Sequence, residues 1–279
     1  CMTPPRTTLP ELAAAYDAFL IDQFGVLLDG AAAYPWAPAA LDWLGRTGKP
    51  VILLSNSGKR SAPNAARLDR LGFRRDSYRL VMSSGEAAFA HLAARLAPGT
   101  PVWLHAREED RSAIDGLDLR ETSRPEDAAL LILAGSQADA LTLGEYEQIL
   151  APAALRGIPM LCTNPDLEML TPLGRRPGAG RIAQLYAELG APVELIGKPH
   201  PLIYHEAARL LPDIPAGRIL CLGDSVEHDI LGGQRAGHAT ALVMSGLHHG
   251  AGADALARLF HAAGAAPDHI IDRFDITGA

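Results

Sequence analysis

Short apolar runs alternate along the chain with longer stretches in which apolar residues recur every three or four positions. The short runs predict buried strands, and the periodic stretches predict amphipathic helices that cover a sheet. The clearest strand candidates are residues 18–21, 51–54, 193–196 and 219–222, and the clearest helix candidates are residues 39–46, 62–71, 181–189 and 201–211. This alternation favours βα units around a parallel sheet, and therefore an α/β fold.

The middle of the chain carries strand candidates of its own, at residues 102–104, 129–133 and 158–161. A Pro- and Gly-rich stretch at 172–180 predicts a return to the first sheet. We therefore expect a core made of residues 1–83 and 178–279, with an inserted α/β domain at residues 84–177.

Composition narrows the class of protein. The 279 residues are 48% hydrophobic and 20% charged, as in a folded globular protein. The net charge is −7 and the basic residues are scattered, which argues against nucleic acid as a partner. No uncharged apolar run is long enough to cross a membrane. The three cysteines form no CxxC pair, which predicts a reducing, cytoplasmic location. Met2 is expected to be the natural start, with Cys1 added before it.

Four of the apolar runs end in a polar side chain, namely Asp22, Ser55, Lys198 and Asp224. Ligands of open parallel sheets bind just beyond the carboxyl ends of the strands. These four side chains are therefore expected to converge at one edge of the sheet.

Each of the first two elements has a chemical interpretation and a simpler one. Asp22 follows a buried strand, where a carboxylate can act as a nucleophile, or it can cap a turn. Ser55 and Asn56 open a segment whose hydroxyl, amide and turn N–H groups can hold a phosphoryl oxygen. A sequence of this kind is also common in ordinary loops.

The later two elements are a cation and a pair of carboxylates. Lys198 is a point charge that can neutralise a nucleophile and a phosphate, although loop lysines are usually solvated. Asp224 and Asp229 follow a strand, and their oxygens suit a hard divalent cation. The alternative is that Asp224 and Ser225 cap the next helix.

Taken in order, the segments Phe19–Leu27, Leu53–Arg60, Ile196–His200 and Cys221–Asp229 resemble the haloacid dehalogenase (HAD) superfamily. Within the middle of the chain, Cys162–Asp166 and Pro177–Gly180 resemble its subclass IIA, which has a large α/β cap. That subclass contains sugar-phosphate, nucleotide and pyridoxal-phosphate phosphatases. The resemblance covers nearly the whole chain. It implies a Rossmann-like core with an inserted cap domain.

The resemblance also implies an activity and a role for each residue. The activity is Mg²⁺-dependent hydrolysis of small phosphorylated metabolites through an aspartyl-phosphate. Asp22 is then the nucleophile, and Ser55, Asn56 and Lys198 contact the phosphoryl group. The implied Mg²⁺ ligands are Asp22, the Phe24 carbonyl, Asp224 and Asp229. A cap-to-cap homodimer is a further implication.

The chain departs from the family at Phe24, where phosphatases carry a second Asp that protonates the leaving group. General acid–base help of this kind is typically worth about 10²–10⁴ in rate. Asp29 lies too far along the loop to replace it. Phe24 itself is expected to pack against the cap or the core.

Three interpretations of Phe24 stay open. The first is a phosphatase that takes its acid–base help from elsewhere. The second is another HAD reaction, such as C–P or C–halogen cleavage. Halide chemistry needs no metal, and the known C–P route needs a cap lysine, which residues 84–177 lack. The third is a weakly active or non-catalytic homologue that binds Mg²⁺ and phosphate.

Overall fold

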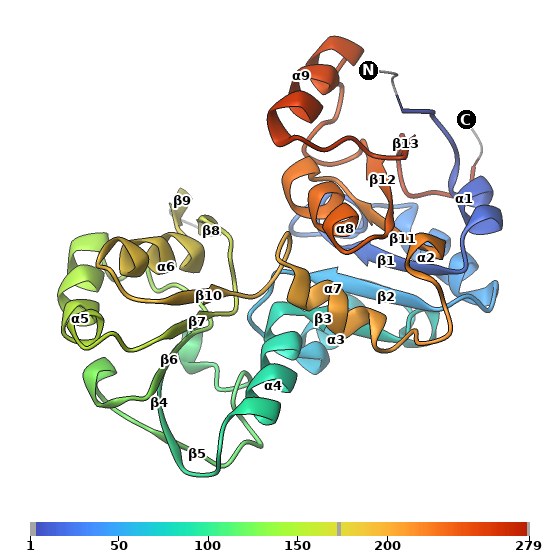
Figure 1. Cartoon of the computed structure of the whole chain (residues 1–279). Coiled ribbons are helices and arrows are strands. Elements are labelled where there is room, and N and C mark those ends of the chain that lie inside the picture. Colours follow the sequence, from blue (N-terminus) through green and yellow to red (C-terminus); the bar gives the residue numbers. More distant parts are fainter. Residues whose placement is uncertain (1–3, 172–173, 278–279) are drawn as a thin grey trace. The chain divides into compact units, whose positions relative to one another are not determined.

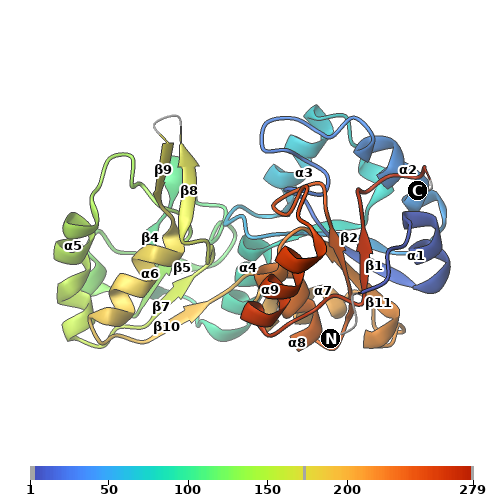
Figure 2. The ribbon, with the colours of Figure 1, turned by 90° about the horizontal axis from the view of Figure 1, so that it is seen from above.

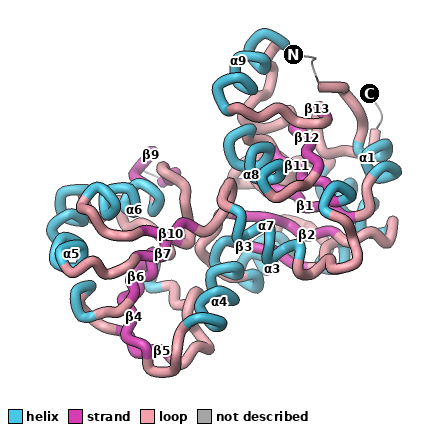
Figure 3. The backbone as a smooth tube through the Cα atoms, in the orientation of Figure 1, coloured by secondary structure: helices cyan, strands magenta, loops and turns pink. Residues whose placement is uncertain are grey.

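The computed structural model describes residues 4–171 and 174–277, which form two compact units. The first unit comprises the chain up to Ser55, Ala62–Met82 and the chain from Lys198. The second unit comprises Asn56–Ser61 and Ser83–Gly197. Both units are α/β, and the alternation of helix and strand can be followed along the tube in Figure 3. Cys1 and Met2 lie outside the described residues, so the predicted start of the chain stays a prediction.

The first unit is built on a six-stranded sheet in the order β13-β12-β11-β1-β2-β3 (Figure 1). Its strands are β1 (Ala18–Asp22), β2 (Val51–Ser55), β3 (Leu80–Ser83), β11 (Ile219–Gly223), β12 (Ala239–Val243) and β13 (His269–Ile271). Its helices are α1 (Leu9–Ala15), α2 (Ala37–Arg46), α3 (Ser61–Arg70), α7 (Pro201–Ala208), α8 (Leu231–Arg235) and α9 (Ala253–Ala263). Strand β1 is central, and it pairs in parallel with β11 on one side and β2 on the other.

Helices cover both faces of this sheet because side chains on a strand alternate between faces. Ala241 points into a core shared with α1 and α2, whereas its neighbour Leu242 packs in a separate cluster with α9. Seen from above, α1 and α2 lie on one side of β1 and β11, and α8 and α9 lie on the other (Figure 2). All five residues of β1 are buried, which agrees with the uninterrupted apolar run that predicts it.

The second unit has a five-stranded sheet in the order β10-β7-β6-β4-β5 and a separate antiparallel pair, β8-β9. Its strands are β4 (Thr100–His105), β5 (Leu119–Glu121), β6 (Leu130–Leu133), β7 (Met160–Cys162), β8 (Glu168–Thr171), β9 (Gly174–Pro177) and β10 (Val193–Leu195). Its helices are α4 (Ser84–Arg95), α5 (Leu143–Leu155) and α6 (Ala179–Glu188). Helix α5 begins with a capping box between Thr142 and Glu145, which fixes its first turn.

Short 3₁₀ turns complete the chain at η1 (Arg75–Ser77), η2 (Arg107–Glu109), η3 (Pro125–Asp127) and η4 (Ala216–Arg218). Within residues 4–171 and 174–277, each helix is too short or too polar to span a lipid bilayer.

The predicted α/β fold with parallel sheets is confirmed, and one strand lies in a different sheet from the one expected. The apolar run at 193–196 forms β10, which pairs with β7 of the second unit and not with the sheet that holds Asp22. The second unit accordingly extends past the boundary expected at 177, to Gly197. The reason is packing, because buried residues of α6 join the same apolar cluster as β7.

Candidate active site

Two neighbouring strands of the first unit bring their polar ends together. Ile21 of β1 lies beside Leu222 of β11, so the residues that follow each strand emerge at the same edge of the sheet. Asp22 is the last residue of β1, and only 8% of its surface is exposed. Asp224 follows β11 directly and is 6% exposed.

A π-helix at Val226–Ile230 aims the third carboxylate at the same place. Ser225 caps it by accepting a hydrogen bond from the His228 N–H, so the capping role belongs to Ser225 and not to Asp224. Asp229 accepts a hydrogen bond of 3.1 Å from the Ser225 N–H, which holds its side chain over β11. A Cβ at Gly223 would lie 2.0 Å from the Asp229 Cγ, so only glycine leaves room for this carboxylate.

Asp224 is fixed by a loop that follows β12. Its Oδ2 accepts a hydrogen bond of 2.8 Å from the Leu247 N–H. Two glycines make room for it, because a Cβ at Gly25 or at Gly246 would lie 1.9 Å or 2.0 Å from the same oxygen. Gly25 has a φ of +77°, which a side chain would also strain. The Ser245 hydroxyl donates to the Gly25 carbonyl at 2.8 Å and joins the two loops.

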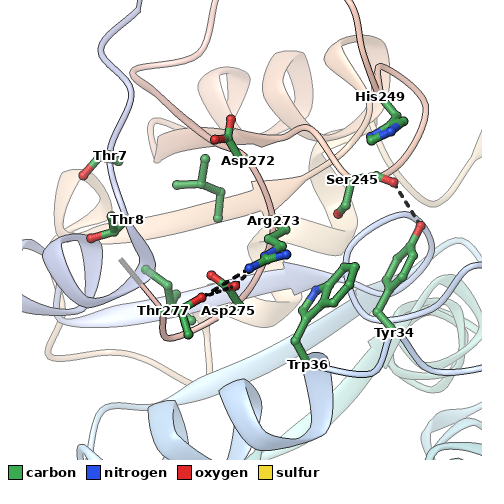
Figure 4. A pocket seen from close by; sticks show the side chains of 12 residues that line it. Thr7, Thr8, Tyr34, Trp36, Ser245, His249, Asp272, Arg273, Asp275 and Thr277 are labelled. Atoms are coloured by element: carbon green, nitrogen blue, oxygen red, sulfur yellow. Dashed lines mark hydrogen bonds and ion pairs between the residues drawn. The ribbon is translucent and has the colours of Figure 1, made fainter. Parts of the chain in front are cut away.

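A cavity of about 550 Å³ lies beside this loop (Figure 4). Tyr34 and Trp36 stack there with ring centroids 5.1 Å apart, and the Tyr34 hydroxyl donates to the Ser245 carbonyl at 3.1 Å. Arg273 lies over the Trp36 ring and pairs with Asp275. These contacts brace the loop that positions Asp224.

Lys198 joins two of the carboxylates, although it does not follow a strand of their sheet. Its Nζ donates to Asp22 Oδ1 at 2.5 Å and to Asp229 Oδ1 at 2.7 Å. All three side chains are buried. The predicted convergence of Lys198 with Asp22 is therefore present, but a loop produces it instead of a strand end.

The charges of this cluster do not balance. One oxygen from each of Asp22, Asp224 and Asp229 lies within 4.8 Å of the others. With all three carboxylates ionised, they and the one ammonium would carry a net charge of two minus in a buried space. Such a site favours a bound divalent cation, since uncompensated buried charge is costly. The oxygen-only donor set suits Mg²⁺.

The pKa values reflect the same excess of negative charge. Burial raises the pKa of Asp22, and Asp229 and Asp224 raise it further, while Lys198 lowers it. Burial, followed by Asp229, raises the pKa of Asp224 to about 6. Burial lowers the pKa of Lys198, but the attraction of Asp22 and Asp229 outweighs it and the net shift is upward. The ammonium therefore stays charged at neutral pH.

Phe24 does not pack into the core of the first unit, so that part of the expectation is wrong, while its packing against the cap stays a prediction. Its side chain is 43% exposed. The Arg67 guanidinium carbon lies 4.9 Å from the Phe24 ring centre. Arg67 Nη2 also donates to the Gln23 side-chain oxygen at 2.7 Å. Burial lowers the pKa of Arg67, with a smaller contribution from Arg70.

Ser55 and Asn56, two of the three residues predicted to contact the phosphoryl group, differ in their surroundings. Ser55 ends β2 beside β1 and is 4% exposed, so it stands at the carboxyl edge of the sheet. Asn56 belongs to the second unit, where its amide donates to Asp166 at 2.9 Å. The Asn164 side chain accepts from the Asp166 N–H at 3.1 Å and orders the same turn.

Sequence reasoning missed the roles of Leu247 and Arg67. Leu247 acts through its backbone N–H, which its residue type cannot signal, although Gly246 beside it marks a tight approach. Arg67 was assigned only to an amphipathic helix, and its contact with Phe24 depends on the packing of α3.

Comparison with known proteins gives consistent matches. A model of haloacid dehalogenase-like hydrolases matches residues 19–120, and a HAD-hydrolase-like model matches residues 195–276. Chronophin from Homo sapiens is 32% identical over 257 residues, covering 86% of this chain and 84% of chronophin. A haloacid dehalogenase-like hydrolase from Brucella suis 1330 has a TM-score of 0.76 at 29% identity, covering 88% of this chain and 90% of that one. A glycerol phosphate phosphatase from Mycobacterium tuberculosis, solved with magnesium, has a TM-score of 0.69 at 26% identity, covering 88% and 71%.

Proposed function

Because this chain belongs to the haloacid dehalogenase-like hydrolases, we propose that it is a Mg²⁺-dependent phosphatase that acts on a small phosphorylated metabolite. The observation that carries the proposal is the buried cluster of Asp22, Asp224, Asp229 and Lys198. Four charged groups in one buried space are expensive for stability, so a chain that keeps them is expected to use them.

Asp22 is the proposed nucleophile. Its Oδ1 is held at 2.5 Å by Lys198, and the other carboxylate oxygen can attack phosphorus. Attack on a phosphate monoester forms an aspartyl-phosphate and expels the leaving group. Water then attacks the aspartyl-phosphate, which releases phosphate and restores the carboxylate. Lys198 counters the charge of the nucleophile and of the incoming phosphoryl oxygens.

Asp22, Asp224 and Asp229 are the side chains that would hold Mg²⁺, together with the Phe24 carbonyl implied by the family resemblance. When bound, the cation would neutralise phosphoryl oxygens and so reduce repulsion between phosphate and carboxylate. A relative of this chain, the glycerol phosphate phosphatase, has been solved with magnesium, which supports this choice of metal. Ser55, at the end of β2, is the proposed hydroxyl donor to a phosphoryl oxygen.

Substrate choice is assigned to the second unit, which we infer to be the cap. Its turn at Asn164 and Asp166 borders a cavity of about 310 Å³ that also contains Lys59 and Arg107. This cavity offers both signs of charge to a metabolite. The location in the cytoplasm and the cap-to-cap homodimer stay predictions from the sequence.

The alternative function is a homologue that binds Mg²⁺ and phosphate without efficient turnover. The observation that favours it is Phe24, which cannot supply a proton to the leaving group. A test must therefore measure both binding and turnover.

We expect the protein to release phosphate from p-nitrophenyl phosphate in a Mg²⁺-dependent manner. This substrate leaves as a stabilised phenolate, so it needs little help from an acid. Removal of Mg²⁺ with EDTA should lower the rate at least about 100-fold, because metal stabilisation of the transition state is worth several kcal/mol. Calorimetric titration with Mg²⁺ is the companion measurement. Mg²⁺ binding without turnover supports the alternative. A protein that shows no Mg²⁺ binding and no turnover would refute both proposed functions.

A further inference from the structure

Phe24, two positions after the proposed nucleophile Asp22, restricts the leaving groups that the site can handle. This inference rests on the proposed phosphatase function. In the family resemblance, the position of Phe24 is that of the Asp that protonates the leaving group, and a phenylalanine ring has no proton to give. An alcohol that departs unprotonated becomes a strongly basic alkoxide, and the missing help is worth about 10²–10⁴ in rate. Either another group provides a proton or the leaving group needs none.

Arg67 is a charged group in contact with this position. Its guanidinium lies on the exposed Phe24 ring, 4.9 Å from the ring centre, and one nitrogen is tied to Gln23. An arginine stays protonated at any ordinary pH, so it can meet negative charge but cannot act as an acid.

The N–H groups around Arg67 are not all used. Arg67 Nε is buried and has no hydrogen-bond partner. Gln23 is fully buried, and its Nε2 likewise has no partner. Buried donors without partners are rare in folded proteins, and these two belong to side chains that contact each other, one of which also lies over the Phe24 ring. Both atoms are shielded from solvent, so a ligand would meet the exposed part of the Arg67 side chain instead.

Arg67 also differs from most arginines of the chain. Arg60 pairs with Glu86, Arg74 with Asp76, and Arg218 with Asp17. Within residues 4–171 and 174–277, no carboxylate forms an ion pair with Arg67. Its half-buried charge is therefore available for a ligand, and the stacking on Phe24 fixes its direction.

We propose that the natural substrate is a phosphate whose leaving group departs as a stable anion, and that Arg67 receives the charge of that anion. Two chemical classes share this property. They are acyl phosphates, which release a carboxylate, and phosphoanhydrides, which release a phosphate. Phe24 and Arg67 together then replace protonation by charge neutralisation.

The reaction balances without an acid. An Asp22 oxygen forms a bond to phosphorus, and the bond from phosphorus to the bridging oxygen breaks. The electron pair of that bond stays on the bridging oxygen, which becomes part of a carboxylate or phosphate anion facing Arg67. In the second step water adds to phosphorus, the Asp22 carboxylate leaves, and the proton of the water leaves with the phosphate product.

The test compares leaving groups at constant conditions with Mg²⁺. Acetyl phosphate and pyrophosphate represent the two proposed classes, and glycerol phosphate represents an alcohol ester. We expect kcat/KM for acetyl phosphate or pyrophosphate to exceed that for glycerol phosphate by at least about 100-fold. The faster of the first two identifies the class.

The variants are Arg67→Ala, Arg67→Lys and, as a matched control, Arg70→Ala. Arg70 is an exposed arginine on the same helix. Arg67→Ala should lose about 10²–10³ of kcat/KM on the preferred substrate, the size of effect seen when one oxyanion donor is removed. It should lose much less on glycerol phosphate. Lysine, or guanidinium ion added to Arg67→Ala, should restore part of the loss, whereas a merely structural role would not respond to either.

The outcomes separate this inference from the proposed function. If p-nitrophenyl phosphate is hydrolysed with Mg²⁺ but glycerol phosphate matches acetyl phosphate and pyrophosphate, the inference alone is wrong. An equal loss on all substrates in a folded Arg67→Ala protein would also overturn it. If Arg67→Ala does not melt cooperatively, kcat/KM of Arg67→Lys on the same substrates is compared with that of the wild type instead.

Discussion

Asp22→Asn should reduce phosphate release at least about 10³-fold, the scale expected when a catalytic nucleophile is removed. An amide has nearly the shape of a carboxylate but does not attack phosphorus. The substitution also removes the negative charge that Lys198 contacts at 2.5 Å. Steady-state rates on p-nitrophenyl phosphate with saturating Mg²⁺ provide the measurement.

Asp29→Asn is the matched control for this experiment. Asp29 lies on the loop after β1, is exposed, and accepts hydrogen bonds from the N–H groups of Ala31 and Ala32. Its substitution should leave the rate within a factor of a few, because it does not reach the carboxylate cluster. A folded Asp22→Asn protein with the wild-type rate would refute the assigned nucleophile.

Removal of the Asp224 carboxylate should lower Mg²⁺ affinity at least about 100-fold and lower turnover with it. Asp224→Ala takes one of three buried carboxylates away from the cluster. The apolar variant also removes an unfavourable buried charge, so its metal-free form should melt at or above the wild-type temperature. Isothermal titration with Mg²⁺ and thermal melting measure these two effects.

Gly25→Ala should also lower Mg²⁺ affinity and turnover, although it changes no charged residue. The new Cβ would lie 1.9 Å from Asp224 Oδ2, so the carboxylate must move. Gly48→Ala separates this clash from backbone strain. Gly48 has the same φ of +77° but nothing within 4 Å of its Cβ position. Both variants should lose about 1–3 kcal/mol of stability from the strained φ.

Only Gly25→Ala should also weaken Mg²⁺ binding. Equal Mg²⁺ affinity in the Gly25→Ala, Gly48→Ala and Asp224→Ala proteins would show that the metal binds elsewhere.

Most of the candidate site could be predicted from the sequence, because its information is local. An apolar run followed by a carboxylate marks the end of a buried strand, and this is correct for β1 and β11. Parallel neighbours then bring Asp22 and Asp224 to the same edge without any knowledge of side-chain packing.

Sheet membership could not be predicted in the same way. The run that forms β10 reads like any buried strand, and only its pairing with β7 assigns it to the second unit. Lys198 was assigned to the cluster through the wrong strand, and it reaches Asp22 because the chain re-enters the first unit there. Pairing partners depend on contacts distant in sequence, which a pattern of apolar residues does not specify.

The exposure of Phe24 and its contact with Arg67 could not be predicted from the sequence either. Its type suggested burial, yet it is 43% exposed and carries Arg67 on its ring. The partner of an arginine on an amphipathic helix depends on how that helix packs. The sequence does not predict strands β12 and β13 or the loop that holds Asp224. No polar residue with an evident chemical role marks the turns that follow these strands.

Trapping the phosphorylated enzyme is the most direct test of the central claim, which is that Asp22 accepts the phosphoryl group. Wild-type protein with Mg²⁺ and p-nitrophenyl phosphate would be quenched in acid within a turnover, digested, and analysed by mass spectrometry. The structure provides no acid–base side chain at position 24 to activate water, so the intermediate should accumulate. The account predicts one phosphoryl group on the peptide that contains Asp22, and none in Asp22→Asn. Phosphate release by an enzyme whose Asp22 peptide is never phosphorylated would contradict it.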